Sequence, residues 1–133
     1  MKTDFICPKC NGHLLVGDKI IFLAITKKDK RSGIILLSPK LGDYTSLLHP
    51  TFKIKEREEV DFFCPICHAN LTATDIDEKL AKIVMVDEKS DKYEIYFSGV
   101  TGEYCTYKVL GNKIEKFGDA SDTYYKYFIN RNI

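Results

Sequence analysis

The chain has 133 residues, with 20 Lys and Arg, 19 Asp and Glu, a formal net charge of +1 and 44% hydrophobic residues. This length fits one domain with a real core, which excludes a wholly disordered chain, and the charge provides no overall basic field for nucleic acid. The longest apolar run, Ile20 to Ile25, is far shorter than the roughly 18 residues of a membrane span. Because the N-terminal residues also lack the apolar core of a secretory signal, we expect a cytoplasmic protein without a membrane partner.

The first half of the chain begins with a cysteine pair and continues into residues typical of β-strands. Cys7 to Cys10 reads Cys-Pro-Lys-Cys, and its proline presets the backbone for a tight turn that brings both sulfurs to one side. Apolar and β-branched runs bounded by Gly, Pro and charged residues then predict strands. The predicted strands of this half are Ile20–Thr26, Gly33–Leu37, Tyr44–Leu48, Phe52–Lys55 and Val60–Phe63.

A basic tip lies between the first two of these strands. It consists of Lys27, Lys28, Lys30 and Arg31, interrupted by Asp29. The simpler interpretation is a solvated hairpin end. The alternative is a loop that contacts phosphate groups, because Lys and Arg side chains neutralise the phosphates of nucleic acid.

The second cysteine pair, Cys64 to Cys67, repeats the spacing and the proline position of the first. Two such turns facing each other supply four thiolates, the tetrahedral sulfur shell that Zn²⁺ prefers. A pair of CxxC redox centres is an alternative, although such a centre normally opens a helix in a βαβ unit, and disulfides are another, although nothing indicates an oxidising compartment. We expect one Zn²⁺ per chain, bound by Cys7, Cys10, Cys64 and Cys67.

The residues around both pairs resemble the metal-binding knuckles of zinc-ribbon and rubredoxin-like proteins. The two stretches read Phe-Ile-Cys-Pro-Lys-Cys-Asn-Gly-His-Leu and Phe-Phe-Cys-Pro-Ile-Cys-His-Ala-Asn-Leu, and the resemblance does not extend beyond them. It implies one metal ion held by the four cysteines, and no particular activity, because such ribbons serve many functions. Rubredoxins usually carry Gly directly after the second cysteine, where this chain has Asn11 and His68. That difference argues against an iron redox centre.

The second half predicts a similar series of strands and ends in an aromatic segment. Gly111-Asn112 marks a tight hairpin, and Thr74 could cap a single helical turn. Ser121 could cap a short helix through Phe128, although the tyrosines in this segment also favour a strand. We expect the segment to pack on the sheet, the alternative being a patch for a partner. The predicted strands are Ala81–Val86, Tyr93–Phe97, Tyr104–Leu110 and Lys113–Phe117.

An internal repeat explains why 53 residues separate the two pairs, which exceeds the usual ribbon spacing of about 12 to 20. The knuckles align at an offset of 57 and the following segments at an offset of 60, which indicates a three-residue insertion within Thr72 to Lys79. Chance similarity between β-rich segments is the alternative. We expect a single domain (1–133) with pseudo-repeat halves at approximately 5–60 and 62–118 and a C-terminal aromatic segment at 119–133.

The expected fold is therefore mainly β, with two similar β-meander halves joined by a zinc-ribbon-like site of four cysteines and little helix. A half of this size is marginal alone, so we expect metal removal to loosen or unfold the chain. Cys105 has Thr45 as its counterpart in the repeat and is expected to be a buried, inert thiol. His13 and His68 could hydrogen-bond near the metal or replace a cysteine ligand, and we favour the former.

The chain contains none of the usual catalytic motifs. It has no Gly-rich phosphate loop, no HExxH, no nucleophile elbow and no open His/Glu zinc site. We therefore expect a non-enzymatic, zinc-stabilised β module that binds a protein partner or forms a homo-oligomer. A nucleic-acid-binding zinc ribbon and a thiol redox or electron-transfer protein are the alternatives.

Overall fold

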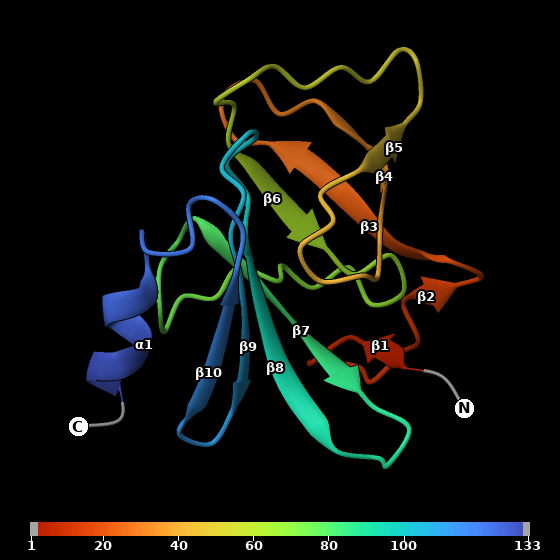
Figure 1. The fold of residues 1–133 in the computed structure, drawn as a ribbon. Helices are drawn as coiled ribbons and strands as arrows, with labels where there is room; N and C mark the ends of the chain where they lie inside the picture. The colour runs from red at the N-terminus through yellow and green to blue at the C-terminus, as the bar shows by residue number, and fades with distance from the viewer. Residues whose placement is uncertain (1–2, 132–133) are drawn as a thin grey trace.

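The computed structural model describes residues 3–131 as two antiparallel sheets and a short helix, so the mainly β prediction is confirmed (Figure 1). The strand order of the first sheet is β1-β7-β8-β9-β10, and that of the second is β2-β3-β4-β5 with β6 also paired to β3. We call them the β7 sheet and the β3 sheet. The β7 sheet contains β1 (Asp4–Ile6), β7 (Leu80–Val86), β8 (Lys92–Ser98), β9 (Thr106–Leu110) and β10 (Lys113–Phe117). The β3 sheet contains β2 (Leu15–Val16), β3 (Lys19–Thr26), β4 (Ser32–Leu37), β5 (Ser46–Leu48) and β6 (Val60–Phe63), and α1 spans Tyr125–Arg131.

The strand that leads into each knuckle pairs with the other half of the chain. β1, from the first half, pairs antiparallel with β7, and β6, at the start of the second, pairs with β3. After each knuckle the chain returns to its own half, because Leu15 pairs with Ile20 of β3 and Thr72 bridges to Ala81 of β7. Each knuckle therefore connects the two sheets.

The two halves make matching backbone pairs. The number of extra residues in the second half, however, differs locally from the three-residue insertion that the sequence predicts. Leu15 and Ile20 are five positions apart and their counterparts Thr72 and Ala81 nine, so the second half carries four extra residues here rather than three. The turn after β3 recovers one residue, because six residues (26–31) lie between the paired residues Ile25 and Ser32, whereas five (87–91) lie between the paired residues Val86 and Lys92. The structure shows that the two halves have similar backbone pairing. That they arose by duplication stays a prediction.

The molecule has three layers, the β3 sheet, the β7 sheet and the C-terminal segment with α1, and an apolar core lies between each neighbouring pair of layers. The inner core lies between the sheets and includes Phe5 and Ile83 from one and Phe22 and Phe62 from the other. The outer core lies on the opposite face of the β7 sheet, under the C-terminal segment, and includes Tyr96, Tyr107, Tyr124 and Phe128. Figure 1 shows α1 beside β9 and β10, on the side away from β3 to β5. The expected packing of the aromatic segment on the sheet is thus observed for Tyr124 and Phe128.

Several local predictions differ from the structure. Phe52 to Lys55 forms no strand, because Phe52 turns inward and its ring lies where a Cβ on Gly33 would be only 2.4 Å away. β9 begins at Thr106 rather than Tyr104, β1 and β2 were not expected, and Thr74 lies in a turn. In the described part of the chain no helix has the length and apolar character needed to cross a membrane.

Candidate functional site

The four knuckle cysteines converge on one point. The Sγ atoms of Cys7 and Cys67 lie 3.8 Å apart, as do those of Cys10 and Cys64, and all four sulfurs lie within 4.8 Å of one another. A tetrahedron with metal–sulfur bonds of about 2.3 Å has edges of about 3.8 Å, whereas a disulfide needs about 2.05 Å. The four cysteines are therefore close enough to hold a metal ion, and each of these 3.8 Å contacts joins the first cysteine of one knuckle to the second of the other.

The knuckle backbone directs N–H groups at the sulfurs. Lys9 and Cys10 donate to Cys7 Sγ at 3.3 and 3.5 Å, and Ile66 and Cys67 donate to Cys64 Sγ at the same distances. Such donors stabilise thiolates bound to a cation. Burial raises the pKa of the Cys7 thiol to about 12, and a cation bound between the four sulfurs would offset this by stabilising the thiolate.

The residue after each knuckle adopts a left-handed backbone conformation. Asn11 has φ of 62° and His68 has φ of 65°. Asn and His are among the non-glycine residues that adopt this region most readily, although it favours glycine. The departure from the rubredoxin pattern is therefore one of residue type and not of an altered turn, so it does not discriminate zinc from iron.

The two histidines near the knuckles are exposed. His13 Nδ1 lies 2.6 Å from Asp4 Oδ2, on the strand that leads into the first knuckle. This contact links the two sides of the knuckle hairpin, which Ile6 and His13 also bridge through their backbones. Neither His13 nor His68 belongs to the group of atoms that converge on the metal position.

Cys105 lies in the outer core, whereas Cys7 and Cys64 belong to the inner core. It is 0% exposed, beside Tyr107 and Val109, and burial raises its pKa to about 12. A thiol held neutral in an apolar environment is a poor nucleophile. The geometry therefore matches the expected buried thiol.

The basic tip is paired with acidic side chains. Arg31 Nε donates to Asp29 Oδ2 and Arg31 Nη2 to Glu58 Oε2, both at 2.6 Å. Lys27 Nζ lies 3.6 Å from Glu59 Oε1 and 3.7 Å from Asp61 Oδ1.

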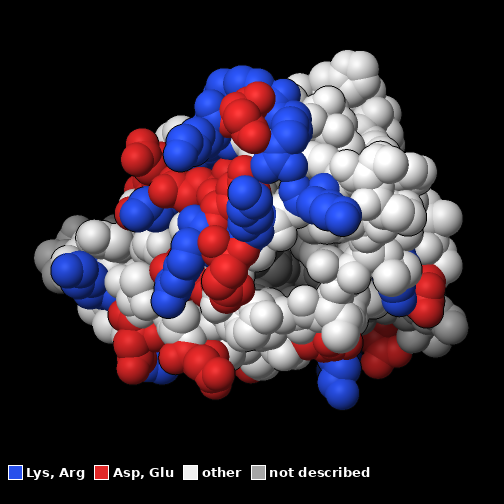
Figure 2. All heavy atoms as spheres, turned by 90° about the horizontal axis from the view of Figure 1, so that it is seen from above, with Lys and Arg blue, Asp and Glu red and all other residues white. Residues whose placement is uncertain are grey.

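Lys28 and Lys30 are the exposed members of the tip. Figure 2 shows Lys and Arg mixed with Asp and Glu over one part of this face, rather than a continuous basic surface. A phosphate at Lys27 or Arg31 would have to compete with carboxylates. Phosphate contact by the tip stays a prediction.

Comparison with known proteins gives no relative: no protein-family model, curated protein or solved structure matches this chain. The function must therefore be argued from the geometry of the chain itself.

The outward face of the β3 sheet is apolar, a feature that the sequence reasoning missed. Along β3 every second residue from Ile20 is buried, and the residues between them point outward. Ile21 and Leu23 lie opposite apolar residues of β4 and β6, whereas Ile25, at the end of the face, lies opposite Ser32 and Asp61. Ile34 and Leu47 are exposed to 48% and 55%. The available signal was the run Ile20 to Ile25, which lacks the polar residues of a strand with one solvated face. We define the outer apolar face as Ile21, Leu23, Ile25, Ile34, Leu36, Leu47 and Phe63.

The matching face of the β7 sheet is covered. At an offset of 60, Leu36 and Leu47 correspond to Tyr96 and Tyr107, which pair across β8 and β9 as the leucines do across β4 and β5. Phe128 of α1 packs on both tyrosines, with ring centroids 4.9 and 4.5 Å away. Within residues 3–131 α1 is the single helix, and it lies on the β7 sheet, so the outer apolar face lacks the cover that its counterpart has.

Proposed function

We propose that the protein is a non-enzymatic, zinc-stabilised β module that self-associates through the outer apolar face. The observation that carries the proposal is the contrast between the two sheets: Tyr96 and Tyr107 are buried under Phe128, whereas at the same positions of the β3 sheet Leu47 is 55% exposed and Leu36 is half-buried. A contiguous exposed apolar patch of this kind marks an interaction site. The cytoplasm, which keeps thiols reduced, is the location that suits the four-thiolate site.

A second copy of the chain is the occupant that fits this face. A twofold axis presents the same patch to itself, and two sheets pack face to face at about 10 Å with their side chains interdigitated. The members of the face are all uncharged, so no like charges oppose each other at its centre. Seven side chains can form the core of an interface that usually involves about 20 to 30 residues a side.

Zinc is the metal that we propose for the four-cysteine centre. Four protein ligands close the coordination shell and leave no position for a substrate, which supports a structural role. Elemental analysis of the purified protein should give one zinc per chain and no visible absorption. A coloured protein with one iron per chain would contradict zinc and favour the electron-transfer alternative.

The self-association is tested by light scattering after size-exclusion chromatography. We expect the zinc-loaded wild type to have the mass of a dimer and Leu47→Lys that of a monomer, because a charge would be buried against its symmetry mate. Leu110→Lys is the matched control, since Leu110 is a 42% exposed leucine on β9 of the other sheet and should leave the dimer intact. Both variants should keep one zinc per chain. A monomeric wild type at tens of micromolar would overturn the proposal.

A further inference from the structure

A pocket of about 220 Å³ opens between the two sheets, separate from the outer apolar face. Protein interiors are packed closely and contain few voids larger than a water molecule, so a space of this size between two apolar sheets requires an explanation. An engineered apolar cavity of about 150 Å³ stays dry and binds benzene. The pocket therefore has room for a molecule somewhat larger than one aromatic ring.

The deep part of the pocket is aromatic. Phe22 of β3, Phe62 of β6 and Phe97 of β8 form a cluster with ring centroids 5.4, 5.6 and 5.1 Å apart. Two of these rings are buried at 6% exposure or less, and all three line the pocket. Ring edges and faces in this arrangement favour a flat aromatic guest. Few polar partners are available at this depth to hold an ordered water.

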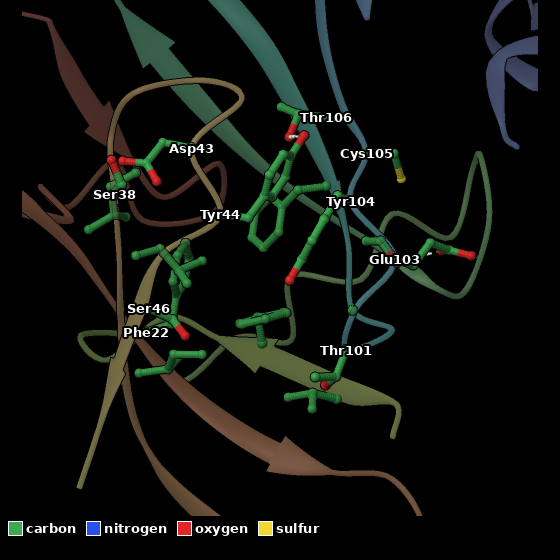
Figure 3. A pocket seen from close by; sticks show the side chains of 18 of the residues that line it. Phe22, Ser38, Asp43, Tyr44, Ser46, Thr101, Glu103, Tyr104, Cys105 and Thr106 are labelled. Atoms are coloured by element: carbon green, nitrogen blue, oxygen red, sulfur yellow. Dashed lines mark hydrogen bonds between the residues drawn. The ribbon is translucent and has the colours of Figure 1, made fainter. Parts of the chain in front are cut away.

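Two stacked tyrosines form one wall of the pocket. The rings of Tyr44 and Tyr104 have centroids 4.8 Å apart and planes 16° apart, and Figure 3 shows them side by side among the residues that line the pocket. Tyr44 is held in place by its hydroxyl, which lies 2.9 Å from Thr106 Oγ1 and donates to the Phe117 carbonyl at 3.1 Å. Gly118 (φ 96°) permits this contact, since a Cβ there would lie 2.6 Å from the Tyr44 hydroxyl.

Acidic groups outnumber basic ones around the pocket. Asp43, Glu56 and Glu103 line it together with one lysine, Lys40. Asp43 accepts hydrogen bonds from Thr45, and these, with one from Ser38, lower its pKa. Asp43 therefore stays ionised at neutral pH. Glu103 turns its carboxylate to the Ser98 and Tyr124 hydroxyls, away from the two tyrosines, so Asp43 and Glu56 are the acidic groups that disfavour a negatively charged guest.

From this geometry we infer that the pocket is a binding site for a small, flat aromatic molecule without negative charge. The aromatic ring occupies the space against Phe22, Phe62 and Phe97, and any polar or cationic group points to the acidic mouth. Binding restores the dispersion contacts that an empty apolar cavity lacks. The site is independent of the outer apolar face, because inward and outward side chains alternate along β3 and β4.

Three indole compounds that differ in charge test the inference. The chain contains no Trp, so indole fluorescence reports on the ligand without background from that residue. We expect indole and the cation tryptamine to bind the zinc-loaded protein saturably, with emission shifted to shorter wavelength. Indole-3-acetate should bind at least about fivefold more weakly, because its carboxylate meets like charge.

Two variants block the pocket from neighbouring positions. Leu37 and Ser46 pair across β4 and β5 and both line the pocket, so Leu37→Phe and Ser46→Tyr each place a ring inside it. Each should weaken indole binding by about tenfold or more. Ser46 is exposed, which makes its variant the safer one for folding, and Val16→Tyr, at a position 61% exposed on β2, is the control that should bind as the wild type does.

Each result of the indole-binding experiments either supports or overturns the inference. Saturable binding that both blocking variants lose and Val16→Tyr keeps supports the inference. It is overturned if indole does not bind saturably, if the folded blocking variants bind as tightly as the wild type, or if indole-3-acetate binds best. Circular dichroism of each variant establishes that it is folded.

Discussion

The four knuckle sulfurs and the backbone atoms near them are held by contacts that tolerate little change. Cys64 is buried, accepts two N–H groups from its own knuckle and lies 3.8 Å from Cys10 of the other. Removing one such sulfur leaves three ligands and breaks the link between the knuckles. The centre should therefore respond to single substitutions as a unit.

Cys64→Ser should weaken metal binding by more than about 100-fold and lower the melting temperature, because the lost ligand belongs to the direct coordination shell. Metal content by elemental analysis and thermal unfolding measure both effects. Cys105→Ser is the matched control, since it removes a buried thiol in the other core and should keep one metal per chain. Full metal content in Cys64→Ser would contradict the assignment.

Gly99 marks a close approach of two backbone segments. A Cβ at this position would lie 2.3 Å from the carbonyl oxygen of Val60, whose N–H donates to the Gly99 carbonyl at 2.8 Å. Gly99→Ala should therefore cost about 2 to 3 kcal/mol of unfolding free energy through overpacking. Gly111→Ala has open space around it but φ of 60°, and should cost about 1 kcal/mol. Urea unfolding compares the two, and equal losses would show that the close approach does not matter.

The pKa of Glu58 reports on the contact of its carboxylate with Arg31 of the basic tip. The Lys55 N–H and then the Arg31 guanidinium lower the pKa of its carboxyl below the ordinary 4.5. A lowered folded-state pKa favours folding above the unfolded value, and this contribution is lost as the pH falls through the folded value. Arg31→Gln should raise the Glu58 midpoint in a carbon-13 NMR titration without restoring 4.5, because the Lys55 N–H remains. Lys30→Gln, which removes an exposed cation of the same tip, should leave it in place.

At the scale of elements, the C-terminal segment stabilises the β7 sheet through one aromatic residue. Phe128 is 0% exposed and packs on two tyrosines from adjacent strands. The preceding backbone is fixed as well, because the Tyr107 hydroxyl donates to the Ser121 carbonyl and accepts from the Tyr124 N–H. Burial and hydrogen bonding together explain how a seven-residue helix is held.

Phe128→Ala should destabilise the protein by about 3 to 5 kcal/mol, the usual range for a buried phenylalanine, and should keep the metal. Urea unfolding and metal analysis measure the two quantities. Tyr127→Ala is the control, because Tyr127 is 39% exposed and its loss should cost far less. Similar losses in both variants would mean that α1 contributes through its backbone rather than through Phe128.

The strands that the sequence predicts well are those with long apolar runs and clear turns. Ile20 to Thr26 and Ala81 to Val86 match β3 and β7 to within one residue. β1 has only three residues and its partner lies some 80 positions away, so no local pattern reveals it. The metal ligands were predictable because their spacing is local, whereas the pocket joins residues from Phe5 to Thr106 and depends on how the sheets pack.

For the whole molecule, metal removal is the decisive perturbation. The free energy of zinc binding in finger peptides, about 10 to 16 kcal/mol, is comparable with the stability of a typical domain, about 5 to 15 kcal/mol. Because each knuckle connects both sheets, chelation should expose amides of β3 and β7 together. Hydrogen exchange and circular dichroism before and after chelation measure this, and returning zinc should restore both. Native circular dichroism and an unchanged melting temperature after complete chelation would contradict the expectation.

The exchange of β1 and β6 between the halves has a further consequence, for how tightly the metal is held. Each half of the chain contributes two cysteines and one strand that pairs with the other half. Residues 49–59, which join β5 to β6, act as a tether that keeps the two halves at a high effective concentration relative to each other. In the intact chain we therefore expect the affinity of this centre for a metal to be independent of protein concentration. A protease cut near His49, which is exposed, would make assembly bimolecular, so that the apparent metal affinity would fall on dilution. The tether thus converts a concentration-dependent association into a property of a single chain.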